Sequence, residues 1–231
     1  MVGGETSTMA RRRQPFTAEL LIDAYCQGIF PMGSRRGIDW YRPDPRGILP
    51  LDGFHAPKSL MQTVRSGRFE IRTDVNFEAV MRACGQRPEG TWITEEILRV
   101  YCELHAAGLA HSVEAWRGGE LAGGLYGVHL GGAFFGESMF FRQRDASKVA
   151  LVGLVEMMRR QGFALLDVQF ATDHLRRFGV VEIPCAEYLR RLEAALAMKC
   201  EWRMAEDESS LDGPSMDESS NKADGDTSPK R

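Results

Sequence analysis

The chain has 231 residues, of which 43% are hydrophobic and 26% are charged, and its formal net charge is -3. This length suits one large domain, or a small domain joined to a medium one. No apolar run approaches the ~18 residues that a membrane-spanning helix requires, and residues 1–13 lack the apolar core of a signal peptide. The five cysteines are scattered without a CxxC pair, which argues against a zinc site or a disulfide framework and favours a reducing cytosol.

The negative charge is concentrated at the end of the chain. Residues 205–231 contain eight acidic and three basic side chains, so residues 1–204 carry 26 basic and 24 acidic ones. This tail is rich in Ser, Asp and Gly and has almost no large apolar residues, so it cannot bury enough surface to fold. We therefore expect disorder over residues 1–14 and over the acidic tail 205–231, with a mildly basic folded body between them.

The first part of the chain is predicted to be mainly helical. Thr17 is a suitable N-cap, and apolar residues follow it at helical spacing. The segment that Pro43, Pro45 and Pro50 punctuate is expected to be irregular. The predicted helices here span residues 17–28, 57–64, 77–84 and 94–107, and the predicted strand spans residues 69–73.

The middle of the chain is predicted to be a β-meander. Gly118-Gly119 and Gly131-Gly132 are strong hairpin signals between strand-like runs. An amphipathic helix and one more strand follow, which makes a strand–helix–strand unit. The predicted strands span residues 111–117, 121–129, 133–140 and 163–170, and the predicted helices span 147–161, 172–178 and 184–198. A mixed sheet with one crossover helix indicates an α+β layer architecture.

Three polar residues, Glu137, Asp167 and Gln169, stand in otherwise apolar, strand-like runs. Burying such groups without partners costs several kcal/mol, so they are usually satisfied by one another or used in chemistry. Each alone has a structural interpretation: Glu137 would pair with an Arg, Asp167 would cap a helix, and Gln169 would bond to the backbone. Because their two strands flank one crossover, we favour a shared site.

Other candidate motifs are weaker. The glycines of Gly123–Gly127 fit neither GxGxxG nor the Walker pattern, and Ser138 does not lie in GxSxG. The five histidines show no metal-ligand spacing, so solvated or capping roles are expected for each. Trp92 is either a core anchor or a stacking platform for a base.

A series of motifs, in order along the chain, resembles the leucyl/phenylalanyl-tRNA–protein transferase family. The resemblance runs from about residue 15 to about residue 195. The matching segments are Ala24-Tyr25, Gly28-Ile-Phe-Pro31, Pro43-Asp-Pro-Arg46, Glu89-Gly-Thr-Trp-Ile-Thr94, Gly123-Gly124, Tyr126-Gly-Val128, Gly136-Glu-Ser-Met-Phe140, Ala146-Ser-Lys148, Asp167 with Gln169, and Glu182-Ile-Pro184.

The resemblance implies an enzyme that moves Leu or Phe, and less readily Met, from aminoacyl-tRNA to proteins that begin with Arg or Lys. The product is marked for degradation by the bacterial-type N-degron pathway. It also implies a small N-terminal α/β domain over residues 15–63 and a GNAT-type acyltransferase domain with a mixed sheet over residues 64–204. The donor ester is already activated, so we expect no metal and no cofactor. We expect a cytoplasmic monomer that does not bind membranes.

The resemblance also implies roles for individual residues. Asp167 and Gln169 would orient and deprotonate the attacking amine, and Glu137 would meet the cationic side chain of the acceptor. The family often has an aromatic residue where this chain has Met32 and Leu154, which puts the ranking of Leu and Phe in question. Trp92 would stack on the terminal adenosine with Met32 covering a base face, and the amino-acid pocket would be formed by Leu125, Phe134, Met139, Leu151, Leu154 and Leu166.

Two other functions fit parts of this pattern. One is a related enzyme that uses aminoacyl-tRNA for another acceptor, such as a cell-wall peptide, which would not need Glu137 to bind a guanidinium group. The other is a tRNA-binding module that forms no peptide bond, against which the presence of Asp167 and Gln169 argues.

Overall fold

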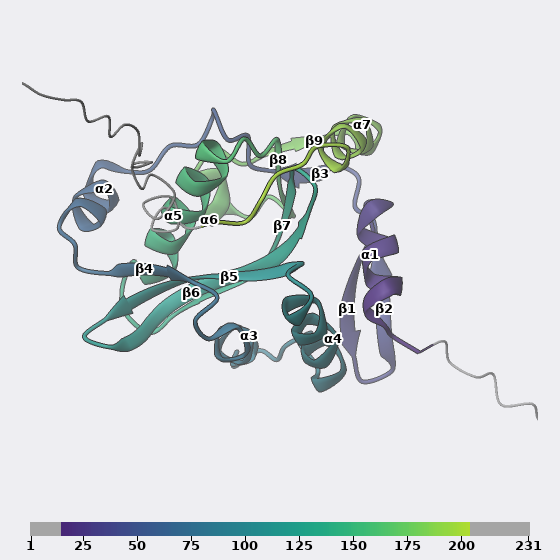
Figure 1. Ribbon diagram of the computed structural model, residues 1–231, viewed down its shortest axis with the longest axis horizontal. Helices are drawn as coiled ribbons and strands as arrows, with labels where there is room; N and C mark the ends of the chain where they lie inside the picture. Colours follow the sequence, from purple (N-terminus) through teal and green to yellow (C-terminus); the bar gives the residue numbers. More distant parts are fainter. Residues whose placement is uncertain (1–14, 204–231) are drawn as a thin grey trace, which may run out of the picture.

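A seven-stranded mixed sheet forms the centre of the protein (Figure 1). The computed structural model describes residues 15–203, so the ends predicted to be disordered, 1–14 and 205–231, lie outside the described part. The strand order is β4-β5-β6-β7-β8-β3-β9, and every pair is antiparallel except β7 with β8. The strands are β3 (Arg46–Ile48), β4 (Glu70–Thr73), β5 (Ala110–Arg117), β6 (Glu120–Leu130), β7 (Ala133–Phe141), β8 (Leu165–Gln169) and β9 (Val181–Ile183).

The helices begin and end close to the predicted positions. Thr17 caps α1 by accepting a hydrogen bond from the Leu20 amide at 3.3 Å, and Thr94 caps α4 by accepting one from the Ile97 amide at 3.3 Å. The predicted helix 172–178 is shorter than expected. The helices are α1 (Ala18–Cys26), α2 (Lys58–Arg65), α3 (Phe77–Gly85), α4 (Glu95–Ala106), α5 (Ala146–Arg160), α6 (Asp173–Arg176) and α7 (Cys185–Leu196).

The prediction of an irregular segment around Pro43, Pro45 and Pro50 was wrong in one respect. Residues Arg46–Ile48 of this segment form β3, which lies inside the main sheet between β8 and β9. Three residues are too few to show an alternating pattern, so only pairing with distant strands reveals them. A hairpin of β1 (Phe30–Ser34) and β2 (Gly37–Tyr41) was also not predicted.

Helices cover both faces of the sheet (Figure 1). One buried cluster joins the sheet to α1, α3, α4 and α7, and the other joins it to α2 and α5. Adjacent residues of β7 alternate between them, because Phe134 belongs to the second cluster and Phe135 to the first. The α+β architecture is therefore confirmed. Among residues 15–203, no helix combines the length and apolar character needed to cross a bilayer.

The parallel pair β7 and β8 with α5 between them confirms the predicted strand–helix–strand unit. The paired residues are Ala133 with Leu165, Phe134 with Leu166, and Phe135 with Asp167. Beyond Phe135 the pairing of these two strands ends, although both strands continue. The sheet therefore splits at this point, and the polar residues predicted to form a site lie at the split.

Candidate active site

A cavity of about 470 Å³ opens where β7 and β8 separate. Of the residues predicted to form an apolar pocket, all but Phe134 line this cavity, and Trp92, Glu137 and Gln169 also face it. The lining pocket residues are Leu125, Met139, Leu151, Leu154 and Leu166. Phe134 instead lies fully buried behind the wall, where its ring stacks on Trp202 with the centroids 5.2 Å apart. The cavity therefore combines apolar walls with a few polar groups, as small-molecule sites do.

A β-bulge directs Glu137 into this cavity. In the pairing of β6 with β7, Tyr126 faces Ser138 and Gly127 faces Gly136, so Glu137 is an extra residue without a partner on β6. Bulges of this kind re-aim a side chain and are frequent beside active sites. Gly127 must be a glycine here, because a Cβ atom on it would clash with the Phe135 carbonyl oxygen and with the Phe134 ring, whose nearest atom would be 2.5 Å away.

The Glu137 carboxylate accepts hydrogen bonds from two phenols and one amide. The Tyr25 hydroxyl donates to Oε1 at 2.6 Å, the Tyr101 hydroxyl to Oε2 at 3.2 Å, and Gln169 Nε2 to Oε1 at 3.3 Å. The two phenol oxygens are themselves 2.5 Å apart. Burial is the main cause that raises the pKa of Glu137 to about 7; the negative Asp167 adds to this, and the phenol hydrogen bonds oppose it.

Asp167 lies beneath the cavity and is not exposed to solvent. Its carboxylate forms a two-pronged ion pair with the fully buried Arg46, with Nε to Oδ1 at 3.0 Å and Nη2 to Oδ2 at 2.6 Å. The Tyr188 hydroxyl donates to Oδ2 at 2.7 Å, and the Gln169 amide N–H donates to Oδ1 at 2.9 Å. The Arg46 guanidinium also donates to the Gly28 carbonyl and lies over the Tyr188 ring, 4.5 Å from its centroid.

Gln169 connects the two carboxylates. Its backbone has φ of +58°, a left-handed conformation that is uncommon outside glycine and is often found at functional sites. The bond from its N–H to Asp167 holds this conformation, and its side-chain amide reaches Glu137. The three predicted residues therefore do lie together. Asp167 contacts the backbone of Gln169, however, while the side chain of Gln169 contacts Glu137.

Trp92 and Met32 lie on two segments that are joined by their backbones. The Gly33 N–H donates to the Trp92 carbonyl at 3.0 Å, and a Cβ atom on Gly33 would lie 2.5 Å from that oxygen. Trp92 lines the cavity, whereas Met32 is not one of the lining residues and is partly buried against the neighbouring core. Arg87 fixes the loop before Trp92, because its Nη2 donates to the Ser138 hydroxyl at 2.9 Å.

The residue-based interpretation missed several partners at this site: Arg46, Tyr188, Tyr25, Tyr101 and Arg87. Two of them, Tyr25 and Arg46, lie in segments that carried the family resemblance. Sequence spacing gives no signal for the others, because each comes from a separate element.

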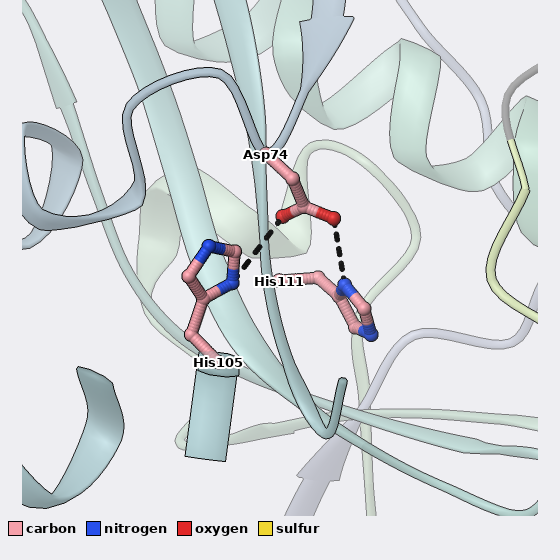
Figure 2. A group of neighbouring side chains, drawn as sticks. All are labelled: Asp74, His105 and His111. Atoms are coloured by element: carbon pink, nitrogen blue, oxygen red, sulfur yellow. Dashed lines mark hydrogen bonds and ion pairs between the residues drawn. The ribbon is translucent and has the colours of Figure 1, made fainter. Parts of the chain in front are cut away.

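A second polar cluster joins α4 to β5 on another part of the molecule. Figure 2 shows Asp74 between His105 and His111. His111 has Nδ1 at 2.7 Å from Asp74 Oδ2 and Nε2 at 3.1 Å from the Gly108 carbonyl, and His105 has Nδ1 at 2.8 Å from the Ala110 carbonyl. Hydrogen bonds to these oxygens account for the arrangement of both histidines without a metal ion. The expectation of solvated or capping histidines was wrong for His111 and His129, which are both buried.

The fold and the cavity together define the class of this protein. A mixed sheet with one crossover helix, whose parallel strands β7 and β8 separate beside an apolar cavity that ends at polar groups, defines an α+β protein with a substrate-sized site. The sheet supplies the rigid frame, and the split supplies room for a substrate at its centre.

Comparison with known proteins identifies the family. Residues 14–44 match the family model described as the leucyl/phenylalanyl-tRNA protein transferase N-terminal domain, and residues 48–193 match that of leucyl/phenylalanyl-tRNA protein transferase. A leucyl/phenylalanyl-tRNA–protein transferase of Paramagnetospirillum magneticum is 59% identical over 191 residues, which are 80% of this chain and 91% of that one. Another, of Gloeobacter violaceus, is 58% identical over 189 residues, 81% of this chain and 97% of that one. The chain therefore belongs to the leucyl/phenylalanyl-tRNA–protein transferase family and is an aminoacyltransferase.

The similarity to solved structures is more distant. The structure of L-PGS from Bacillus licheniformis has a TM-score of 0.37 and 15% identity, over 69% of this chain and 55% of that one. Similarity at this level carries no argument about function. The domain boundary predicted at residue 63 stays a prediction, and the two family models meet between residues 44 and 48.

Proposed function

We propose that this transferase moves Leu or Phe, and less readily Met, from aminoacyl-tRNA to the N-terminal amine of proteins that begin with Arg or Lys. The observation that carries this proposal is the cavity between β7 and β8, which has apolar walls and ends at Glu137 and Gln169. An apolar side chain fits the walls, and an amine fits the polar end. The reaction takes place in the cytoplasm, where aminoacyl-tRNA is made, and the monomeric state remains a prediction.

The walls of the cavity account for a preference for large apolar amino acids. Leu125, Leu151, Leu154 and Leu166 line it, together with Met139. An apolar pocket separates Leu from the smaller Val by only about 1–3 kcal/mol, so some transfer of Met is expected. Leu154 leaves more room than an aromatic side chain would, and this room favours Phe.

The loop with Trp92 supports the proposed position of the tRNA end. Trp92 forms one side of the cavity, and Met32 lies next to it through the bond from Gly33. A base stacked on an aromatic ring gains about 1–3 kcal/mol. In the proposed complex the terminal adenosine rests on Trp92, and the ester carbonyl then lies toward Glu137 and Gln169.

The acceptor rule requires a negative charge for the cation of Arg or Lys. Two carboxylates face the cavity, Glu137 at its polar end and Glu89 on the exposed loop at its rim. A charge-assisted hydrogen bond to either would explain selection of a basic N-terminal residue. The product begins with Leu or Phe and enters the N-end rule pathway of protein degradation.

The test of this proposal is direct transfer. Purified protein is mixed with tRNA that carries radiolabelled leucine or phenylalanine and with three acceptors that differ only in their first residue: Arg, Lys or Ala. We expect label on the Arg and Lys acceptors and none on Ala. Label on all three, or only on a peptide side-chain amine, would contradict the acceptor rule. Binding of the tRNA without transfer to any acceptor would favour a binding module.

A further inference from the structure

The attacking amine must lose a proton during the proposed reaction, and the inference below rests on that proposed function. The expectation from the sequence places this proton with Asp167 and Gln169. An amide has no useful basicity, so the choice of acceptor lies between the two carboxylates, Asp167 and Glu137. Their surroundings differ in three ways: the charge of their partners, their access to the cavity and the number of donors that already occupy them.

Asp167 is poorly placed to accept a proton. Four donors occupy its two oxygens: two groups of Arg46, the Tyr188 hydroxyl and the Gln169 N–H. Transfer of a proton to Asp167 would break its two-pronged ion pair with Arg46 and leave that buried cation without a counter-charge. The side chain is also fully buried below the cavity, so an amine in the cavity has no path to it.

Glu137 differs from Asp167 mainly in the charge of its partners and in its access to the cavity. Its carboxylate faces the cavity, and its hydrogen-bond donors at Tyr25, Tyr101 and Gln169 are neutral groups. The bulge in β7 fixes the direction of the side chain, and the close contact of the two phenols fixes the carboxylate. We propose that Glu137 is the catalytic residue that takes the proton from the attacking α-amine, and that Tyr25 and Tyr101 are positioning residues that hold its carboxylate at the cavity.

The chemical step balances without any further reactant. The neutral α-amine attacks the acyl carbon of the aminoacyl ester, a C–N bond forms, and the bond from that carbon to the ribose oxygen breaks. One proton moves from the amine nitrogen to Glu137 and from there to the departing ribose oxygen, which leaves as a hydroxyl group. Glu137 ends the cycle ionised, as it began.

The electrostatic surroundings suit a group that both takes and returns a proton. The charged and titratable groups that act on Glu137 are Tyr25 on α1, Tyr101 on α4, Asp167 on β8 and Arg46 on β3. Tyr126 on β6 lines the same cavity but makes no hydrogen bond to Glu137. Burial raises the pKa of Glu137 to about 7, and the hydrogen bonds from Tyr25 and Tyr101 work against that rise. A general base is most efficient when its pKa lies near the working pH.

The experiment is a pH profile of kcat/KM for transfer to an N-terminal Arg acceptor. An α-amine has a pKa of about 7.7–8.0, so protonation of the acceptor and of Glu137 both slow the reaction at low pH. For the wild type we expect log kcat/KM to rise with pH at a slope of about two below pH ~6.5. Glu137→Gln removes one of these two groups, so we expect a slope of about one and a rate lower by about 10²–10⁴-fold.

Removal of one phenol tests the positioning role. Tyr25→Phe and Tyr101→Phe each remove a hydrogen bond that lowers the pKa of Glu137, so we expect the limb of the profile to move to higher pH. Tyr126→Phe is the matched control, because the Tyr126 hydroxyl has no hydrogen-bond partner within residues 15–203. We expect this control to leave the limb at the wild-type position.

The outcomes separate this inference from the proposed function. A slope of two that persists in Glu137→Gln would overturn the inference while the transferase activity stands. If the low-pH limb of the kcat/KM profile stays at the wild-type pH in both Tyr25→Phe and Tyr101→Phe, the positioning role is wrong. These two variants also test the inference if Glu137→Gln does not fold. Absence of transfer by the wild type would overturn the proposed function and this inference together.

Discussion

The buried ion pair between Asp167 and Arg46 yields a quantitative prediction for Asp167→Asn. Both side chains are fully buried, and the substitution leaves the Arg46 cation without its counter-charge. Removing one partner of a buried pair costs about 3–5 kcal/mol. For a domain of this size each kcal/mol lowers Tm by about 2–4 °C, so we expect a decrease of roughly 6–20 °C.

The measurements are urea unfolding, which gives the free energy of unfolding, and thermal unfolding, which gives Tm, of the wild type and the variant, both followed by circular dichroism. Glu95→Gln is the control, because Glu95 pairs with Arg82 at 3.0 Å but is 82% exposed, and such pairs contribute about 0–1 kcal/mol. The double variant Arg46→Met with Asp167→Leu removes both charges and is expected to recover much of the lost stability. If Asp167→Asn lowers the free energy of unfolding by less than about 1 kcal/mol, the reasoning is refuted.

The same variant distinguishes the roles of the two carboxylates. If Asp167 acts by holding Arg46 and the backbone of Gln169, the Asp167→Asn protein should transfer amino acids slowly. At a temperature where it is folded, its log kcat/KM should still rise with pH at a slope of two. If the slope falls to one in Asp167→Asn and stays at two in Glu137→Gln, Asp167 is the proton acceptor and the assignment to Glu137 is wrong.

Three further substitutions test the donor and acceptor sites. Leu154→Phe narrows the cavity, so the ratio of kcat/KM for Phe to that for Leu should fall several-fold, and an unchanged ratio would place the amino acid elsewhere. Gly33→Ala forces the Trp92 carbonyl away, so KM for aminoacyl-tRNA should rise with little change in kcat, whereas Gly53→Ala, whose Cβ atom would meet only ordinary contacts at 3.5 Å, serves as the control. Glu89→Gln should raise KM for an N-terminal Arg acceptor and leave the pH profile unchanged, and an unchanged KM would assign the cation to another group.

Much of the fold could be predicted because its signals are local. The glycine pair at 118–119 has positive φ at both positions, as a tight hairpin requires, and Thr17 and Thr94 cap helices where the pattern placed them. The short strand β3 could not be found this way, because its three residues are held only by β8 and β9 from much later in the chain. The hairpin β1–β2 was missed because Pro31 argues against a strand, although an edge strand tolerates it.

The sequence predicts which residues form the candidate site, but it does not predict the hydrogen bonds and ion pairs that they make. Glu137, Asp167 and Gln169 come together because a crossover helix brings their strands into parallel contact. Their bonding pattern depends on residues far away in the sequence: Arg46 lies 121 positions before Asp167, and Tyr25 lies 112 positions before Glu137. The bulge that directs Glu137 is a property of the pairing between two strands, so one strand's sequence does not show it.

The central claim is that the cavity between β7 and β8 holds the side chain of the transferred amino acid. The measurement that tests it most directly is photocrosslinking with tRNA that carries photo-leucine, followed by mass spectrometry of the labelled peptides. We predict label on residues of the apolar wall, Leu125, Leu151, Leu154 and Leu166, and loss of this label when unmodified Leu-tRNA competes. Specific label on a surface away from these residues, with transfer activity intact, would contradict the account.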